Sequence, residues 1–218
     1  MTPLIDTAAT TTAMTSTAAT TTAVIDAAAI KTAVIKTADL KAAGVPRYVI
    51  DLRCRPGGPW QRILPGVLLL SAKPPTRAQR VRAALAYAGP EAVLTGIDAL
   101  RELGFADLPL PPLIHVLQPA THRKTGNDRL RLERTTRLPK PVLKDGLPLA
   151  PPARAVLDAA RHEPHPHRQQ TMITTVLRTG GVSVTTLLRE LDAGGQRGSG
   201  TPRTTLRRLA RDHRAAFT

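Results

Sequence analysis

Arginine is the residue type that could do chemistry in the stretch from Gly44 to Leu70, GVPRYVIDLRCRPGGPWQRILPGVLLL. If this stretch begins as a helix, Arg47, Asp51 and Arg55 are spaced i, i+4 and i+8 and form one row on its surface. Guanidinium groups in such a row can donate to phosphate oxygens and to the acceptor edge of guanine. An ordinary solvated face is the other interpretation of the same row.

A helix followed by a hairpin would position these side chains. Pro46 suits a first helical turn and the Pro/Gly run at 56–59 stops a helix, so the sequence predicts a helix over 46–55. Two short strands are predicted at 60–63 and 67–70, joined by a Pro-Gly turn. The candidate DNA-binding residues on and around these elements are Lys36, Arg47, Tyr48, Asp51, Arg53, Arg55 and Arg62.

Two shorter helices are predicted before that segment. Ala, Ile and Leu recur at helical spacing from Val24 onward, which predicts one helix around 25–32 and a second element that includes Ile35 and is helical over 38–43. Thr37 is expected to cap the second helix, and Gly44 to end it. Three helices followed by a hairpin are the order of a winged helix-turn-helix, in which one helix enters the major groove.

The net charge favours a polyanionic partner. The chain has a formal net charge of +15, and residues 1–44 hold as many lysines as aspartates, so the whole surplus follows them. A basic folded body attracts nucleic acid through counterion release, ahead of anionic membrane and acidic protein surfaces. No stretch reaches the roughly 18 apolar residues of a transmembrane helix, and no signal peptide is evident. Charge alone does not choose among these partners. Together with the predicted winged helix-turn-helix, it leads us to expect double-stranded DNA as the partner, no membrane association, and a cytoplasmic, nucleoid-associated protein.

A second basic region surrounds two predicted strands at 113–118 and 129–133, the latter with charged residues alternating with leucines. Its members are Arg123, Lys124, Arg129, Arg131, Arg134 and Arg137. Three interpretations of this region stay open: a second phosphate contact, a surface for an acidic partner protein, and a charged surface that serves solubility.

The residues do not support catalysis. Asp39-Leu40-Lys41 is the one triplet with the spacing of a metal-dependent nuclease strand, and it lies in a predicted helix without a second acidic partner. Glu133 is followed by Arg134 and Thr135, which breaks the same pattern because no lysine stands two positions after the acid. The sequence has neither a Walker phosphate loop nor a Gly-x-Ser-x-Gly elbow. We expect a protein that is not an enzyme.

The sequence also predicts no metal and no cofactor. His162, His165 and His167 are close in sequence, but two prolines interrupt them and structural zinc requires four ligands. We interpret them as a solvated turn. The single cysteine, Cys54, is interpreted as a small buried hydrophobe; a redox-sensing thiol, with a pKa lowered by the flanking arginines, is the alternative.

The rest of the pattern predicts an α+β fold: a winged helix-turn-helix, then a small mixed α/β domain and a helical C-terminal region. Thr76 and Thr95 are expected to cap helices, and Arg154 with Asp158 to form a surface pair. The expected domains are a disordered Ala/Thr-rich tail at 1–22, the winged helix at 23–72, the mixed domain at 73–163 and the helical region at 164–218. The further predicted elements are helices at 76–88, 95–104, 152–160, 167–178, 184–192 and 202–213 and a strand at 142–149.

Four blocks, taken together and in order, resemble the AbiEi-type antitoxins and transcriptional regulators of actinobacteria. The blocks are TADLKAAGVPRYVIDLRCRPGGPWQRILPGVLLL at 37–70, PPTRAQRVRAALAYAGPEAVLTGIDALRELGF at 74–105, PPLIHVLQP at 111–119 and DGLPLAPPARAVLDAAR at 145–161. The resemblance spans about residues 24–180.

The resemblance implies a DNA-binding winged helix that regulates its own promoter. It also implies a second domain that, in antitoxins, neutralises a nucleotidyltransferase-like toxin, which makes a toxin protein a candidate partner. Larger relatives carry a nuclease-like domain after the helical region, and we expect this chain to lack it. A homodimer is expected because paired half-sites multiply a weak single contact. The alternative to a DNA-binding regulator is a protein-binding antitoxin module without strong DNA binding.

Overall fold

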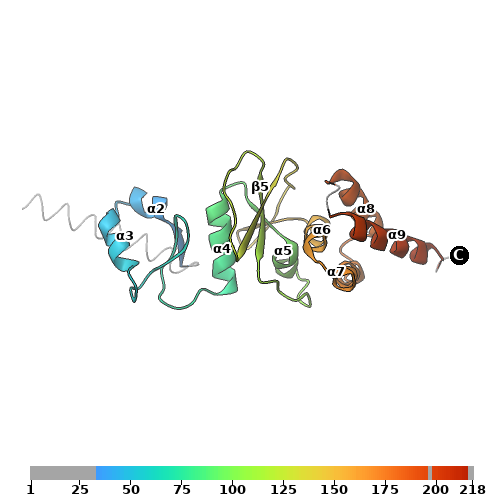
Figure 1. The fold of residues 1–218 in the computed structure, drawn as a ribbon, viewed down its shortest axis with the longest axis horizontal. Helices are drawn as coiled ribbons and strands as arrows, with labels where there is room; N and C mark the ends of the chain where they lie inside the picture. Colours follow the sequence, from blue (N-terminus) through green and yellow to red (C-terminus); the bar gives the residue numbers. More distant parts are fainter. Residues whose placement is uncertain (1–32, 196–197, 216–218) are drawn as a thin grey trace, which may run out of the picture. The chain divides into compact units, whose positions relative to one another are not determined.

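The computed structural model describes residues 33–195 and 198–215 (Figure 1). The expected tail at 1–22 and the first expected helix, around 25–32, lie outside the described residues. The chain divides into two compact units between Tyr87 and Ala88, and each unit is described by itself. Helices and two separate sheets give an α+β fold, as the sequence predicts.

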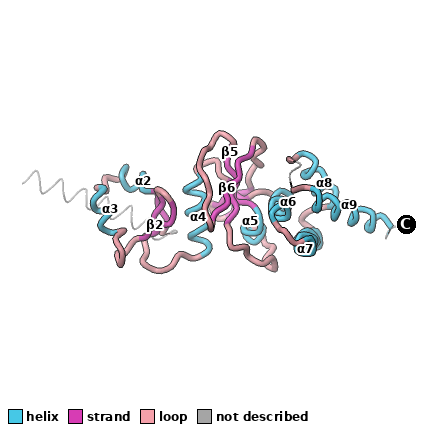
Figure 2. The backbone as a smooth tube through the Cα atoms, viewed as in Figure 1, coloured by secondary structure: helices cyan, strands magenta, loops and turns pink. Residues whose placement is uncertain are grey.

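The first unit has a three-stranded antiparallel sheet with strand order β1-β3-β2. Its strands are drawn in magenta near the label β2 in Figure 2. Its core forms where the sheet and two short helices bring together the side chains of Ile35, Leu40, Val45, Ile50, Trp60 and Leu68. Its elements are β1 (Val34–Lys36), α2 (Thr37–Ala42), α3 (Arg47–Arg53), β2 (Gln61–Leu64), β3 (Val67–Leu69) and α4 (Arg77–Ala88), the last of which reaches the unit boundary.

A tight turn fixes the end of α3 to the hairpin. The amide of Gly58 donates to the Arg55 carbonyl at 2.8 Å, and the amide of Trp60 donates to the Arg53 carbonyl at 3.1 Å. A Cβ atom added at Gly58 would lie 2.4 Å from the Arg53 carbonyl oxygen, so only glycine allows the backbone to come this close. The Arg53 guanidinium carbon also lies 5.0 Å from the centre of the buried Trp60 ring, at cation–π distance.

The second unit is built on a mixed five-stranded sheet with the order β6-β5-β4-β8-β7. The pairs β4–β8 and β5–β6 are parallel, and β4–β5 and β7–β8 are antiparallel. Helix α6 packs against β4 and against α5, α7 and α8, so it lies at the centre of the unit. The elements are β4 (Val93–Thr95), α5 (Gly96–Glu102), β5 (Ile114–Pro119), β6 (Leu130–Thr135), β7 (Val142–Lys144), β8 (Leu147–Leu149), α6 (Pro152–His162), α7 (Pro166–Arg178), α8 (Val184–Ala193) and α9 (Gly200–Ala215).

Most of the elements expected from the sequence are confirmed, with ends displaced by a few residues. Thr76 caps α4 as expected: its hydroxyl accepts from the Gln79 amide at 3.2 Å, and the Gln79 side chain accepts from the Thr76 amide at 3.0 Å. This reciprocal pair is a capping box. Gly44 ends the α2 turn with a φ of 82°, in the left-handed region that glycine tolerates.

Other local expectations are wrong. Ile35 lies in strand β1 rather than a second helical element, because pairing with β3 overrides local helical spacing. Thr37 lies inside α2, whose N-cap is Lys36. The single strand expected at 142–149 is a hairpin: Asp145 and Gly146 have φ values of 50° and 73°, which suits a two-residue turn between β7 and β8.

Two further differences concern β4 and its end. The strand Val93–Thr95 was not expected, because its three buried residues are too short a run to show a period. Thr95 does occupy the N-cap position of α5, but its hydroxyl makes no capping bond and instead donates to Asp158 at 2.8 Å.

Replacing Gly58 by Ala should destabilise the first unit by about 1–3 kcal/mol, because the added methyl group overlaps the Arg53 carbonyl and the backbone must shift. Urea unfolding monitored by the fluorescence of Trp60, the only tryptophan, measures this unit. Gly200→Ala is the matched control, since a Cβ atom there meets nothing within 4 Å. Equal stability of the Gly58 variant and the parent protein would contradict the assigned turn.

Candidate functional site

The surface of α3 is the first candidate site, because it exposes apolar and charged side chains together. Tyr48 is 71% exposed and Leu52 is 51% exposed, and they are one helical turn apart. Neighbouring exposed apolar side chains are a feature that contact surfaces often have, which makes this face a candidate. Leu52 was not among the residues selected from the sequence, although its spacing from Tyr48 could have identified it.

Most of the predicted DNA-binding residues share this surface. Arg47, Asp51, Arg53 and Arg55 lie on or directly after α3 and are exposed, as are Tyr48 and, on β2, Arg62. Lys36 is half-buried at the end of β1, opposite Val67, and so belongs to the sheet rather than to α3.

Asp51 organises the charges of this surface. Its carboxylate accepts a hydrogen bond from Arg62 on the hairpin at 2.6 Å and lies 3.6 Å from the Arg47 side chain. Each partner is at least half exposed, so the pairs contribute little to stability. They do hold one arginine of α3 and one of the hairpin on either side of a carboxylate.

Cys54 is half-buried against the core of the first unit. Burial raises the pKa of its thiol; Arg62 opposes this shift and Asp51 adds to it. A raised pKa reduces the thiolate fraction, which disfavours the redox-sensing interpretation and favours the packing one.

The second basic region is not one uniform surface. Arg137 is partly exposed, and its guanidinium donates to the Glu190 carboxylate. Arg129 lies 3.9 Å from Asp128, and Arg131 is half-buried on β6. Arg123, Lys124 and Arg134 are exposed.

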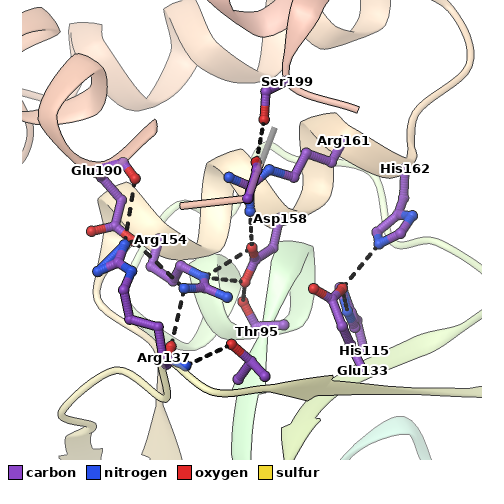
Figure 3. A network of polar contacts seen from close by, with 12 residues as sticks. Thr95, His115, Glu133, Arg137, Arg154, Asp158, Arg161, His162, Glu190 and Ser199 are labelled. Carbon is purple, nitrogen blue, oxygen red and sulfur yellow. Dashed lines mark hydrogen bonds and ion pairs between the residues drawn. The ribbon is translucent and has the colours of Figure 1, made fainter. Parts of the chain in front are cut away.

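The second candidate site lies where α6 crosses the sheet, and its centre is the buried Asp158 (Figure 3). One carboxylate oxygen accepts from the Thr95 hydroxyl at 2.8 Å, and both are 2.9 Å from Arg154 Nε. Arg161 adds a bond of 3.2 Å. Arg154 and Asp158 are 5% and 1% exposed, so the expected surface pair is wrong: both residues face the sheet and the neighbouring helices.

The same network extends to α8. Arg154 Nη1 donates to the Arg137 carbonyl at 3.3 Å and lies 3.7 Å from the Glu190 carboxylate, which Arg137 also contacts. Two carboxylates and three arginines therefore lie together where β4, α6 and α8 meet, with one positive charge in excess (Figure 3).

Beside this network, His115 of β5, Glu133 of β6 and His162 of α6 converge (Figure 3). The Oε2 atom of Glu133 lies 3.0 Å from His115 Nε2 and 3.1 Å from His162 Nε2, and the two rings meet edge to face. Because a carboxylate only accepts, each ring carries a proton on Nε2 here. These two hydrogen bonds hold the pKa of Glu133 well below its ordinary value, against the effect of burial.

This cluster was not found from the sequence. His162 was grouped with His165 and His167, which are exposed at the start of α7, whereas its partners lie on two strands. The one local signal was the alternation that places Glu133 on the polar face of its strand.

Asp158→Ala should destabilise the second unit by about 3–5 kcal/mol, because it leaves the buried Arg154 without its partner. Thermal unfolding followed by circular dichroism measures the effect. The control is Asp192→Ala, which breaks the more exposed pair with Arg203 and should cost no more than about 1 kcal/mol. Similar losses from both changes would contradict a central role for Asp158.

No family model matches the chain, and no curated protein matches it. Among solved structures, the chain is similar to the crystal structure of the RV2827C protein from Mycobacterium tuberculosis, with a TM-score of 0.56 and 18% sequence identity. The similarity covers 86% of this chain and 76% of that chain. At this identity the likeness shows the fold alone. In the part of the chain that the structure describes, no helix combines the length and the apolar character that crossing a membrane requires.

Proposed function

We propose that this protein is a transcriptional regulator that binds double-stranded DNA through α3 and the β2–β3 hairpin. The observation that carries the proposal is the exposed face of α3, where Tyr48 and Leu52 stand beside the row of Arg47, Asp51 and Arg55. A major groove is wide enough for one helix, and arginines on that helix can reach guanine edges while apolar groups contact thymine methyls.

The arrangement of the first unit supports this proposal. Two helices joined by the turn at Gly44 precede an antiparallel hairpin, and a strand before α2 pairs with the hairpin. This order matches the last two helices and the wing of a winged helix-turn-helix, in which α3 would be the reading helix and the hairpin the wing. Arg62, held on the hairpin beside Asp51, is placed to contact the backbone phosphates next to the groove.

The charge of the chain supports it as well. A formal net charge of +15 attracts DNA at long range, and the arginines of α3 and the hairpin would convert that attraction into contacts. In this proposal the protein is an autoregulatory antitoxin of the AbiEi type that acts as a homodimer on its own promoter in the nucleoid, without catalysis.

Replacing Arg47 and Arg55 together by Ala should weaken binding to the chain's own promoter roughly 10- to 100-fold, because two groove or phosphate contacts are lost. Fluorescence anisotropy at several salt concentrations measures both the affinity and its salt dependence. A plot of the logarithm of the binding constant against the logarithm of the salt concentration has a negative slope, and each lost phosphate contact should reduce its magnitude by about 0.9.

The matched control is Arg168→Ala with Arg189→Ala, which removes the same charge from exposed positions on α7 and α8. If this control weakens binding as much as the α3 variant does, the effect is one of net charge and α3 is not the reading helix.

Asp51→Asn should strengthen binding several-fold, because it releases Arg47 and Arg62 from their shared carboxylate and removes a negative charge that would face the phosphates. The same anisotropy titration measures it, with an unrelated DNA of equal length alongside. Weaker binding would instead mean that Asp51 is needed to orient Arg62.

A protein-binding module is the second candidate function, and the edge strand β7 favours it. All three residues of β7 are exposed, with Leu143 at 74% and Val142 at 42%. An exposed apolar edge strand can pair with a partner chain. The partner in this interpretation is a nucleotidyltransferase-like toxin. Leu143→Glu should then abolish co-elution with that toxin and leave promoter binding unchanged.

A further inference from the structure

We infer that His115, Glu133 and His162 form a binding site for a divalent transition-metal ion, with Zn²⁺ as the best match. Two imidazole nitrogens and one carboxylate oxygen are ligands that zinc takes in proteins, and three protein ligands leave a fourth position for water or another group. This site is separate from the α3 surface, and its test does not depend on the proposed function.

The distances between the ligand atoms suit such an ion. Glu133 Oε2 is 3.0 Å from His115 Nε2 and 3.1 Å from His162 Nε2, and all three ligand atoms lie within 4.8 Å of one another. Tetrahedral zinc with bonds of about 2.0–2.1 Å separates its ligand atoms by about 3.3 Å. Two of the three separations therefore need to change by only a few tenths of an ångström, and the third, between the two histidine ligand atoms, is at most 4.8 Å.

The three ligands are held by different parts of the second unit. In the parallel β5–β6 pair, His115 is opposite Arg131 and Leu117 is opposite Glu133, so the carboxylate is two positions further along on the same face as His115. His115 is buried. The network around Asp158 holds α6 against this face, and His162 lies one helical turn beyond Asp158. The site is therefore largely formed before any ion binds.

One part of the local field, the end of α6, favours a cation. His162 is the last residue of the eleven-residue helix α6, and the carbonyl end of a helix carries partial negative charge. Arg161, next to it, is compensated by Asp158. Arg131 opposes the ion, because alternation places it on the same face of β6 as Glu133. Binding displaces the two Nε2 protons that Glu133 accepts in the metal-free cluster.

Zinc binding is measured on the untagged, full-length protein after treatment with a chelator, by isothermal titration calorimetry. Cobalt(II) gives a second readout, because its visible absorption bands report four-coordinate geometry. The expected result is one ion per chain. His162→Ala and Glu133→Gln should each weaken zinc binding at least about tenfold. Loss of a residue that supports a ligand already lowers metal affinity by about tenfold or more, and loss of the ligand itself costs no less.

The matched control is His165→Ala with His167→Ala, which removes two exposed histidines near His162 and should leave the affinity unchanged. His162→Cys should restore binding and add a sulfur-to-cobalt charge-transfer band. Arg131→Gln should increase the affinity a few-fold. Circular dichroism checks that each variant is folded.

Two results would overturn the inference. One is a parent protein that binds no stoichiometric zinc or cobalt, because this measurement requires no variant to fold. The other is an equal loss of binding in the control pair, which would place the ion at the α6–α7 turn instead.

Discussion

The buried Asp158 carboxyl group, enclosed among Arg154, Arg161 and Thr95, is the constraint on which the second unit depends. A carboxylate removed from water is tolerated only when nearly all of its acceptor positions are used, and here two side chains of its own helix and one from β4 use them. This requirement fixes both the rotation of α6 and its distance from the sheet. The position of His162 beside Glu133 follows from it, and Arg154 carries the same constraint onward to α8 through Glu190.

The first unit differs, because the ion pairs of Asp51 lie on its surface. Asp51 joins α3 to the hairpin through arginines that are at least half exposed, and a small apolar core around Trp60 supplies the stability. Exposed pairs exchange partners easily, because water screens them. The arginines can thus leave Asp51 for another partner without loss of the fold, which a buried network such as that of Asp158 would not permit.

The sequence predicts the helices, strands and turns that are determined by residues close together in the chain. The α3 helix, its stop at the Pro/Gly run and the hairpin all follow from local signals, and six of the seven predicted DNA-binding residues lie on α3, just after it or on the hairpin. The sequence does not predict the elements and contacts that depend on residues distant in the chain. Strand β1 and strand β4 are each three residues long, the burial of Arg154 with Asp158 needs α8 in place, and the site at His115 joins residues from three elements.

The parallel pairing of β4 with β8 has a consequence for how the second unit is made. The register joins Leu94 to Leu149, so β4, in the middle of the sheet, gains its second neighbour only after β5, β6 and β7 have been synthesised. Pairing of strands distant in sequence is slow, and until it is complete one edge of β4 stays open to other chains. Helix α6 begins directly after β8 and brings Asp158 to Thr95 of β4. Closure of the sheet and the contacts of Asp158 with Thr95, Arg154 and Arg161 thus become possible in the same stretch of synthesis, whereas Glu190 of α8 joins the network later.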